Sequence, residues 1–274
     1  GVPLPEPQFA PGEAGDGLSV RGLRASYDRT AVWEQVSFSA PRGQITAITG
    51  HNGAGKTTFL NCLANLIAPE RGEILLNGRD IRRIPLREVA KEIGYVPQII
   101  VPTFDFSVLD YVVTGCAPRL GTFSRPKQEH YDMAMESIRR MGIEKLCNRS
   151  YSQISGGERQ QVSIARALAQ RPAFILMDEP TAHLDYGNQI KVLKTIRSLK
   201  EEGYGVILTT HNPDHALLLQ DQVAVLDRTG RLQAGRDVDI LQEHALSELY
   251  ETPLKLFYDE RLQRKVCAAP QFDA

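Results

Sequence analysis

The segment Gly50-His51-Asn52-Gly53-Ala54-Gly55-Lys56-Thr57 decides the fold. It fits the pattern G-x-x-x-x-G-K-[ST], and it lies between an apolar run at residues 45–49 and a helical pattern that starts at Lys56. Glycines in such a loop let backbone amides point inward without Cβ clashes, and the start of a helix adds positive potential. We therefore predict a phosphate-binding loop, in which Lys56 bridges two phosphates and the Thr57 hydroxyl holds Mg²⁺.

Strand and helix patterns alternate after this loop. Apolar runs at residues 173–177, 206–210 and 223–226 read as strands, and Val192, Ile196 and Leu199 mark an amphipathic helix between the first two. Strand, helix and strand at this spacing predict a parallel sheet with helices on its faces.

A second candidate site, after the phosphate loop, is an acidic pair at the end of a predicted strand. Residues 174–177 are apolar and are followed by Asp178, Glu179 and Pro180. Ligands of parallel sheets bind beyond the carboxyl ends of the strands, so both carboxylates are expected beside the phosphate loop. Asp178 can coordinate Mg²⁺ through water, and Glu179 can face an attacking water as general base.

A second anion site is predicted at residues 155–161. Ser155, Gly156 and Gly157 stand before a helical pattern, where free amides can meet a phosphate. Ser155 and Glu158 also satisfy a simple capping box, and both readings can hold at once.

In this segment the sequence closely resembles the ABC (ATP-binding cassette) ATPase family. Residues 155–160 resemble its signature motif, residues 50–57 its Walker A motif and residues 177–180 its Walker B motif. Four single residues match further family positions in the same order: the adenine-stacking Tyr27, the Q-loop Gln98, the D-loop Asp185 and the switch histidine His211. The resemblance covers about residues 18–235.

The resemblance implies an α/β fold: a P-loop NTPase (RecA-like) core with a parallel sheet, an N-terminal antiparallel β subdomain and an inserted helical subdomain at about residues 99–154. A flexible tail (1–17) would precede the ATPase domain (18–235), and an extension (236–274) would follow it. It also implies ATP and Mg²⁺ as cofactors. Glu179, His211 and Gln98 would be catalytic, and Thr57, Gln98 and Asp178 would hold the metal. ATP would contact Tyr27, Gly50, His51, Asn52, Gly53, Ala54, Gly55, Lys56, Thr57, Thr58, Ser155, Gly157, Glu158 and Asp185.

Each single match has an ordinary structural alternative. Tyr27 can be a core tyrosine, Gln98 a loop residue, and His211 a satisfied strand-end histidine. Asp185 can cap the next helix, and His51 occupies a variable position where an exposed bystander is expected. Their joint order favours the functional interpretation. The chain departs from the family pattern at Ile154, Glu158 and residues 182–183.

In this family a signature cannot reach the phosphate loop of its own chain. The resemblance therefore implies a head-to-tail homodimer that holds two ATP molecules. Three stretches, residues 75–81, 107–115 and 210–216, resemble the importer group for iron–siderophores, haem, cobalamin and molybdate or tungstate, and residues 120–127 resemble its molybdate-type members. An exporter subunit or a scaffold of iron–sulfur cluster assembly remains open as an alternative.

Composition limits the remaining partners and the location. Lysine plus arginine count 32 against 33 acidic residues, so the chain has no overall basic footprint for nucleic acid. No apolar run approaches the roughly 20 residues that span a bilayer, and the four scattered cysteines predict reduced thiols. We expect a peripheral subunit on the cytoplasmic face of the cell membrane, bound to permease subunits that work with a separate substrate-binding protein. The apolar residues 99–106 either receive the permease or pack on the helical subdomain.

Overall fold

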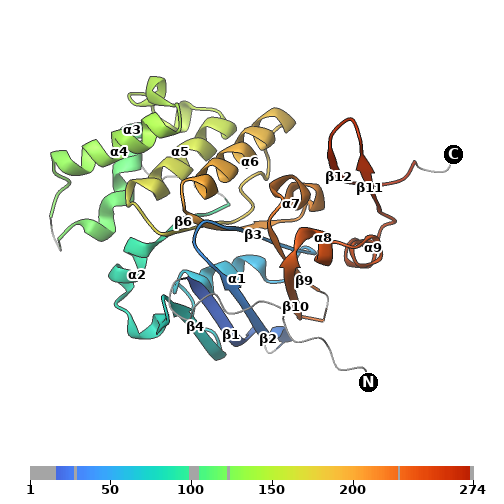
Figure 1. The fold of residues 1–274 in the computed structure, drawn as a ribbon. Coiled ribbons are helices and arrows are strands. Elements are labelled where there is room, and N and C mark those ends of the chain that lie inside the picture. Colours follow the sequence, from blue (N-terminus) through green and yellow to red (C-terminus); the bar gives the residue numbers. More distant parts are fainter. Residues whose placement is uncertain (1–16, 28–29, 99–104, 122–123, 228, 272–274) are drawn as a thin grey trace.

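Two sheets, a layer of helices and a C-terminal hairpin make up the fold (Figure 1). The computed structural model describes residues 17–27, 30–98, 105–121, 124–227 and 229–271. Residues 99–104 of the predicted permease-binding segment lie outside this part of the chain. The larger sheet has the strand order β10-β9-β3-β8-β7-β6, and the smaller sheet has the order β2-β1-β4-β5.

The six-stranded sheet confirms the predicted parallel core. Its strands are β3 (Ile45–Gly50), β6 (Ile93–Val96), β7 (Phe174–Met177), β8 (Gly205–Thr210), β9 (Gln222–Leu226) and β10 (Leu232–Arg236). The first five are parallel, and β10 pairs with β9 in the antiparallel direction. This edge strand was not predicted, because its sequence LQAGR lacks the apolar run of the buried strands.

Helices cover both faces of this sheet, which explains why its central strands are continuously apolar. They are α1 (Lys56–Leu63), α5 (Gly156–Ala169), α6 (Tyr186–Glu201) and α7 (Pro213–Leu219). Successive residues of one strand point to opposite faces: Ile175 and Met177 pack with α5, α6 and α7, whereas Phe174 and Leu176 pack on the side of α1.

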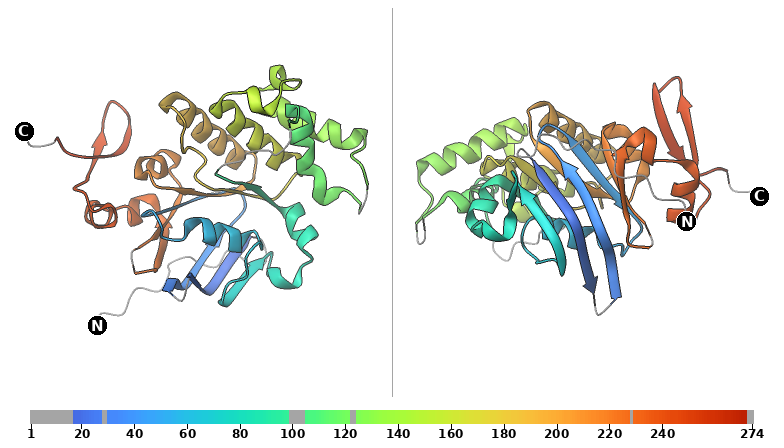
Figure 2. Two further views of the ribbon diagram at one scale, coloured as in Figure 1. Left: turned by 180° about the vertical axis from the view of Figure 1, so that it is seen from behind. Right: turned by 60° about the horizontal axis from the view of Figure 1, so that its bottom comes forward.

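The helix that follows the phosphate loop lies between the two sheets (Figures 1 and 2). The smaller, antiparallel sheet consists of β1 (Leu18–Tyr27), β2 (Thr30–Ala40), β4 (Arg71–Leu76) and β5 (Arg79–Asp80). Phe59 of α1 meets the fully buried Trp33 of β2 edge to face, with ring centroids 5.6 Å apart. Packing on both sides therefore holds α1, and with it the phosphate loop, in place.

A separate apolar core joins the helices at the other end of the molecule. It contains α3 (Val108–Val113), α4 (Gln128–Arg140) and one face of α5. Helix α2 (Leu86–Glu92) is not part of this core and precedes strand β6. Ser107 caps α3 by accepting a hydrogen bond of 3.0 Å from the backbone N–H of Asp110. Within the described residues, no helix is long and apolar enough to cross a membrane.

The C-terminal segment forms two helices and a hairpin on the opposite side of the molecule from α3 and α4 (Figures 1 and 2). The elements are α8 (Asp237–Ile240), α9 (Glu243–Tyr250), β11 (Lys255–Asp259) and β12 (Arg264–Ala268). Helix α9 buries Leu246 and Leu249, which lie at helical spacing. The hairpin was missed, since only Leu256 and Cys267, which are register partners, pack against the core.

Candidate functional site

Strand register brings four predicted motifs to one edge of the six-stranded sheet. Val96 of β6 pairs with Met177 of β7, Met177 pairs with Leu208 of β8, and Thr49 of β3 pairs with Thr210 of β8. The residues just beyond these strand ends must therefore be neighbours in space. They are Gln98, the pair Asp178 and Glu179, His211 and the phosphate loop.

The phosphate loop has the conformation that its glycines predict. Gly53 and Gly55 have φ angles of 85° and 83°, a region that side chains disfavour. The buried ammonium of Lys56 turns back into the loop, and its Nζ donates hydrogen bonds to the carbonyls of Gly50 at 2.9 Å and His51 at 3.0 Å. Asn52, Gly53 and Thr57 are exposed, Thr58 is half-buried and Ala54 is buried. The loop thus offers its amides and one ammonium to an anion.

Burial makes the charged form of Lys56 less favourable. Removal from water lowers the pKa of Lys56 below its ordinary value of 10.5, and the carboxylates of Glu179 and Asp178 oppose that shift. A desolvated ammonium interacts strongly with an incoming phosphate, because little water screens it.

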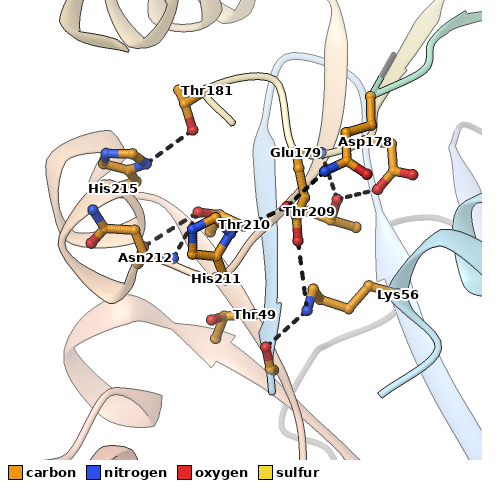
Figure 3. A network of polar contacts seen from close by, with 12 residues as sticks. Thr49, Lys56, Asp178, Glu179, Thr181, Thr209, Thr210, His211, Asn212 and His215 are labelled. Atoms are coloured by element: carbon orange, nitrogen blue, oxygen red, sulfur yellow. Dashed lines mark hydrogen bonds and ion pairs between the residues drawn. The ribbon is translucent and has the colours of Figure 1, made fainter. Parts of the chain in front are cut away.

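Three polar side chains converge on the carboxylate of Glu179. The Nε2 of Gln98 donates a hydrogen bond of 3.3 Å to its Oε2, and the Nδ1 of His211 lies 3.2 Å from the same oxygen. The Nζ of Lys56 lies 3.8 Å from Oε1 (Figure 3). Glu179 itself has a φ of 44°, which is rare for a side-chain-bearing residue. Such strain at a strand end is frequent at functional sites.

Asp178 occupies a different environment from its neighbour. It is 3% exposed, and its Oδ1 accepts a hydrogen bond of 2.7 Å from the hydroxyl of Thr209. The same Thr209 oxygen accepts the backbone N–H of Glu179 at 2.8 Å (Figure 3). Thr209 thus orients both acidic residues, a role that the sequence reasoning missed. Its position two residues before His211, at the end of an apolar strand, was the available signal.

The predicted signature residues lie apart from this cluster. Ser155 caps α5 and forms the predicted capping box with Glu158, whose Oε2 accepts the backbone N–H of Ser155 at 2.9 Å. This bond and the one from the Ser155 hydroxyl lower the pKa of Glu158 below its ordinary value. In the described part of the chain, the hydrogen bonds of Ser155 and Glu158 stay within this turn, and none reaches the phosphate loop.

The signature instead contacts the start of α6. A Cβ on Gly157 would fall 2.6 Å from the Cγ of Asn188, so any larger residue there would displace this side chain. Asn188 is held by Asp185, which caps α6 and accepts hydrogen bonds from the backbone N–H of Asn188 at 2.8 Å and from its side-chain amide at 2.7 Å. The backbone N–H of Asn188 is the main cause that lowers the pKa of Asp185. Asp185 therefore caps α6, which was the structural alternative to a functional role. Through Asn188 this cap lies next to the signature residue Gly157. Tyr27 ends β1, and its side chain lies outside the described part of the structure.

A further contact near the site was also missed. The buried His215 of α7 places its Nδ1 3.2 Å from the hydroxyl of Thr181, which follows the acidic pair (Figure 3). Burial lowers the pKa of His215 below its ordinary value of 6.5. This neutral contact ties α7 to the turn after β7.

Comparison with known proteins agrees with these motifs. The profile of the family described as ABC transporter matches residues 33–182. A Helicobacter pylori protein named "Probable iron chelatin transport ATP-binding protein" is 37% identical over 249 residues, which are 89% of this chain and 97% of that relative. A molybdate import ATP-binding protein of Haemophilus influenzae is 32% identical over 250 residues, with coverage of 90% and 92%.

A solved structure matches the whole architecture. It belongs to a metal-chelate type ABC transporter in an inward-facing conformation, with a TM-score of 0.83 and 30% identity over 94% of this chain and 98% of that chain. The family match includes the phosphate loop, the signature and the acidic pair whose geometry is described above. The chain therefore belongs to the ABC transporter family, as one of its ATP-binding subunits.

Proposed function

We propose that this chain hydrolyses ATP and thereby drives a membrane importer. The observation that carries the proposal is the convergence of Lys56, Gln98 and His211 on the carboxylate of Glu179. A phosphate-loop lysine, a strand-end carboxylate and two orienting side chains are the groups that phosphoryl transfer to water requires.

Each residue has a distinct part in the proposed reaction. The amides of residues 50–58 and the ammonium of Lys56 hold the β- and γ-phosphates, and Tyr27 stacks on the adenine. Glu179 accepts a proton from the attacking water, because its oxygens are held in place yet 15% exposed. Gln98 and His211 orient this carboxylate, and His211 also contacts the γ-phosphate. Gln98 and His211 thus act by positioning and by electrostatic interaction, and neither forms a covalent bond to the substrate.

The residues present suit Mg²⁺. The proposed ligands Thr57, Gln98 and Asp178 offer a hydroxyl, an amide and a carboxylate, which are oxygen donors from three different elements. Within the described residues, no cluster of three or more His, Cys, Asp or Glu side chains could hold a metal ion. One carboxylate together with substrate phosphates and water is the usual set for Mg²⁺. The bound cation would neutralise charge that develops on the phosphates.

The position of the signature supports a head-to-tail homodimer. Among the described residues, the side-chain hydrogen bonds of Ser155 and Glu158 stay within the first turn of α5 and do not reach the phosphate loop of the same chain, so we propose that this turn meets a phosphate bound by a second copy. Asp185 lies beside it at the start of α6. Two ATP molecules would then be shared between opposing half-sites, and hydrolysis would remove the contact that closes the dimer.

The relatives support the importer role and a metal-containing cargo. The names of two of them specify iron chelatin transport and molybdate import, and the similar solved structure is of a metal-chelate type transporter. We propose that this chain binds permease subunits on the cytoplasmic face of the membrane and serves a metal chelate or metal oxyanion, such as iron–siderophore, haem, cobalamin, molybdate or tungstate. A substrate-binding protein would complete the system. Co-purification with an integral membrane partner would separate this role from that of a scaffold ATPase.

Glu179→Gln tests the hydrolytic role. The amide keeps the size of the side chain but cannot accept the proton, so the variant is expected to bind MgATP and to release phosphate at least a hundredfold more slowly. Closed dimers should accumulate in size-exclusion chromatography with MgATP. Glu201→Gln, at the exposed end of α6, is the matched control. Wild-type turnover in Glu179→Gln would refute the assignment of the base.

A further inference from the structure

The C-terminal segment contacts two elements that carry residues of the nucleotide site. We call residues 243–268, which comprise α9 and the hairpin β11–β12, the C-terminal strap. They follow the part of the chain that the family profile matches, at residues 33–182. Nothing in the chemistry proposed above uses them, yet the strap places two hydrogen-bonding side chains on elements that carry the site.

The first contact is a bidentate ion pair. Arg264, at the start of β12, donates from Nη1 to Oδ1 of Asp214 at 2.7 Å and from Nη2 to Oδ2 at 2.9 Å. The backbone N–H of Cys267 adds a hydrogen bond of 3.3 Å to Oδ1. The two charged side chains are only 15% and 22% exposed, so solvent screens them less than an ordinary surface pair. The pair fixes the hairpin against the first turn of α7.

This turn directly follows His211. Asn212 caps α7, and its Oδ1 accepts the backbone N–H of Asp214 at 2.9 Å. The backbone N–H of Asn212 in turn donates to the hydroxyl of Thr210 at 3.1 Å (Figure 3). His211 therefore lies between a residue of the central sheet and a cap whose partner is held by Arg264. A shift of the first turn of α7 would move the imidazole relative to Glu179.

The second contact fixes the other end of the strap. The hydroxyl of Tyr250, at the end of α9, lies 2.8 Å from the hydroxyl of the fully buried Thr49, which precedes the phosphate loop. Within the strap, Glu243 joins α9 to β11 by accepting the backbone N–H of Leu256 at 3.1 Å. The strap is thus anchored both to strand β3, just before the phosphate loop, and to α7, just after His211.

We propose that Arg264 is a positioning residue for the ATPase reaction, and that it holds His211 in register with Glu179 through Asp214. This inference rests on the proposed hydrolytic function. It gives the C-terminal strap a kinetic role in addition to packing. A purely structural role would instead lower thermal stability and leave the turnover of the folded protein unchanged.

Arg264→Gln in the full chain tests the proposal. We expect kcat for ATP hydrolysis to fall roughly tenfold, because small displacements of a catalytic group are costly. KM and the Kd of MgATP should stay unchanged, since Lys56 and its loop are untouched. Arg261→Gln, an exposed arginine in the turn of the same hairpin, is the matched control and should keep the wild-type kcat.

A double-mutant cycle separates positioning from general destabilisation. Asp214→Asn should lower kcat as much as Arg264→Gln, and the double variant should lower it no further, because both changes break one contact. If Arg264→Gln does not fold, Arg264→Lys keeps the charge but not the bidentate geometry and should give an intermediate kcat. Wild-type kcat in the folded variant, or additive losses, would overturn the proposal. ATP turnover that Glu179→Gln abolishes but Arg264→Gln leaves intact would refute only the role of the strap.

Discussion

The hydroxyl of Thr209 lies 2.7 Å from Oδ1 of Asp178, and both side chains are buried beneath the nucleotide site. Through this one oxygen, strand β8 holds the carboxylate at the end of β7 and also accepts the backbone N–H of Glu179 at 2.8 Å. The two acidic residues are adjacent in sequence but have different surroundings. Asp178 faces a buried hydroxyl, whereas Glu179 faces Gln98, Lys56 and His211.

Thr209→Val is expected to impair both folding and hydrolysis. Valine has the shape of threonine but leaves the buried carboxylate of Asp178 and the N–H of Glu179 without this partner. The free energy of unfolding should fall by about 1–3 kcal/mol, and kcat should fall roughly tenfold because Glu179 loses its anchor. Urea unfolding and phosphate release measure the two effects. Thr195→Val, on α6, is the matched control, and equal losses in both variants would contradict the assigned role.

Gly157→Ala should disturb the contact between the signature and α6. The new methyl group would overlap the side chain of Asn188, which its bonds to Asp185 hold in place. Overpacking of this kind costs about 1–3 kcal/mol, so a clear loss of thermal stability is expected in differential scanning fluorimetry. Gly156→Ala is the control, because the nearest atom to its Cβ is 3.9 Å away. Equal melting temperatures for the two variants would show that the site can expand.

The lowered pKa of the buried His215 predicts that the folded protein loses stability in acid. Burial lowers its pKa below 6.5, nearby His211 acts in the same direction, and Asp214 opposes them. Above pH 6.5 both folded and unfolded states are neutral at this residue. Below it the unfolded chain binds the proton first, so the free energy of unfolding falls as the pH decreases towards the folded pKa.

Unfolding in urea between pH 7.5 and 5.5 measures this effect. His215→Gln keeps a polar partner for Thr181 but cannot titrate, and it should show a smaller loss of stability across that range. His244→Gln, on the exposed face of α9, should keep the wild-type slope. An unchanged slope in His215→Gln would assign the acid sensitivity to other groups.

Local sequence was sufficient where a motif carries its own geometry. The glycines at positions 53 and 55 predict a loop with positive φ angles, and the alternation of apolar strands and helices predicts the parallel sheet. The hairpin β11–β12 was not predictable in this way. Its strands pair with each other, and β11 exposes Phe257 and Tyr258 while Asp259 is half-buried, so the apolar residues of the sequence do not mark a buried face.

The sequence by itself was enough to predict which residues carry the proposed chemistry: Lys56 in its loop, Gln98, the adjacent Asp178 and Glu179, and His211. Only the tertiary structure decided three contacts. Thr209 forms hydrogen bonds with both acidic residues, Gly157 packs on Asn188, and Arg264 forms an ion pair with Asp214. The physical reason is that these contacts join residues 30 to 50 positions apart. Their partners are chosen by strand register and helix packing, which no short stretch of sequence encodes.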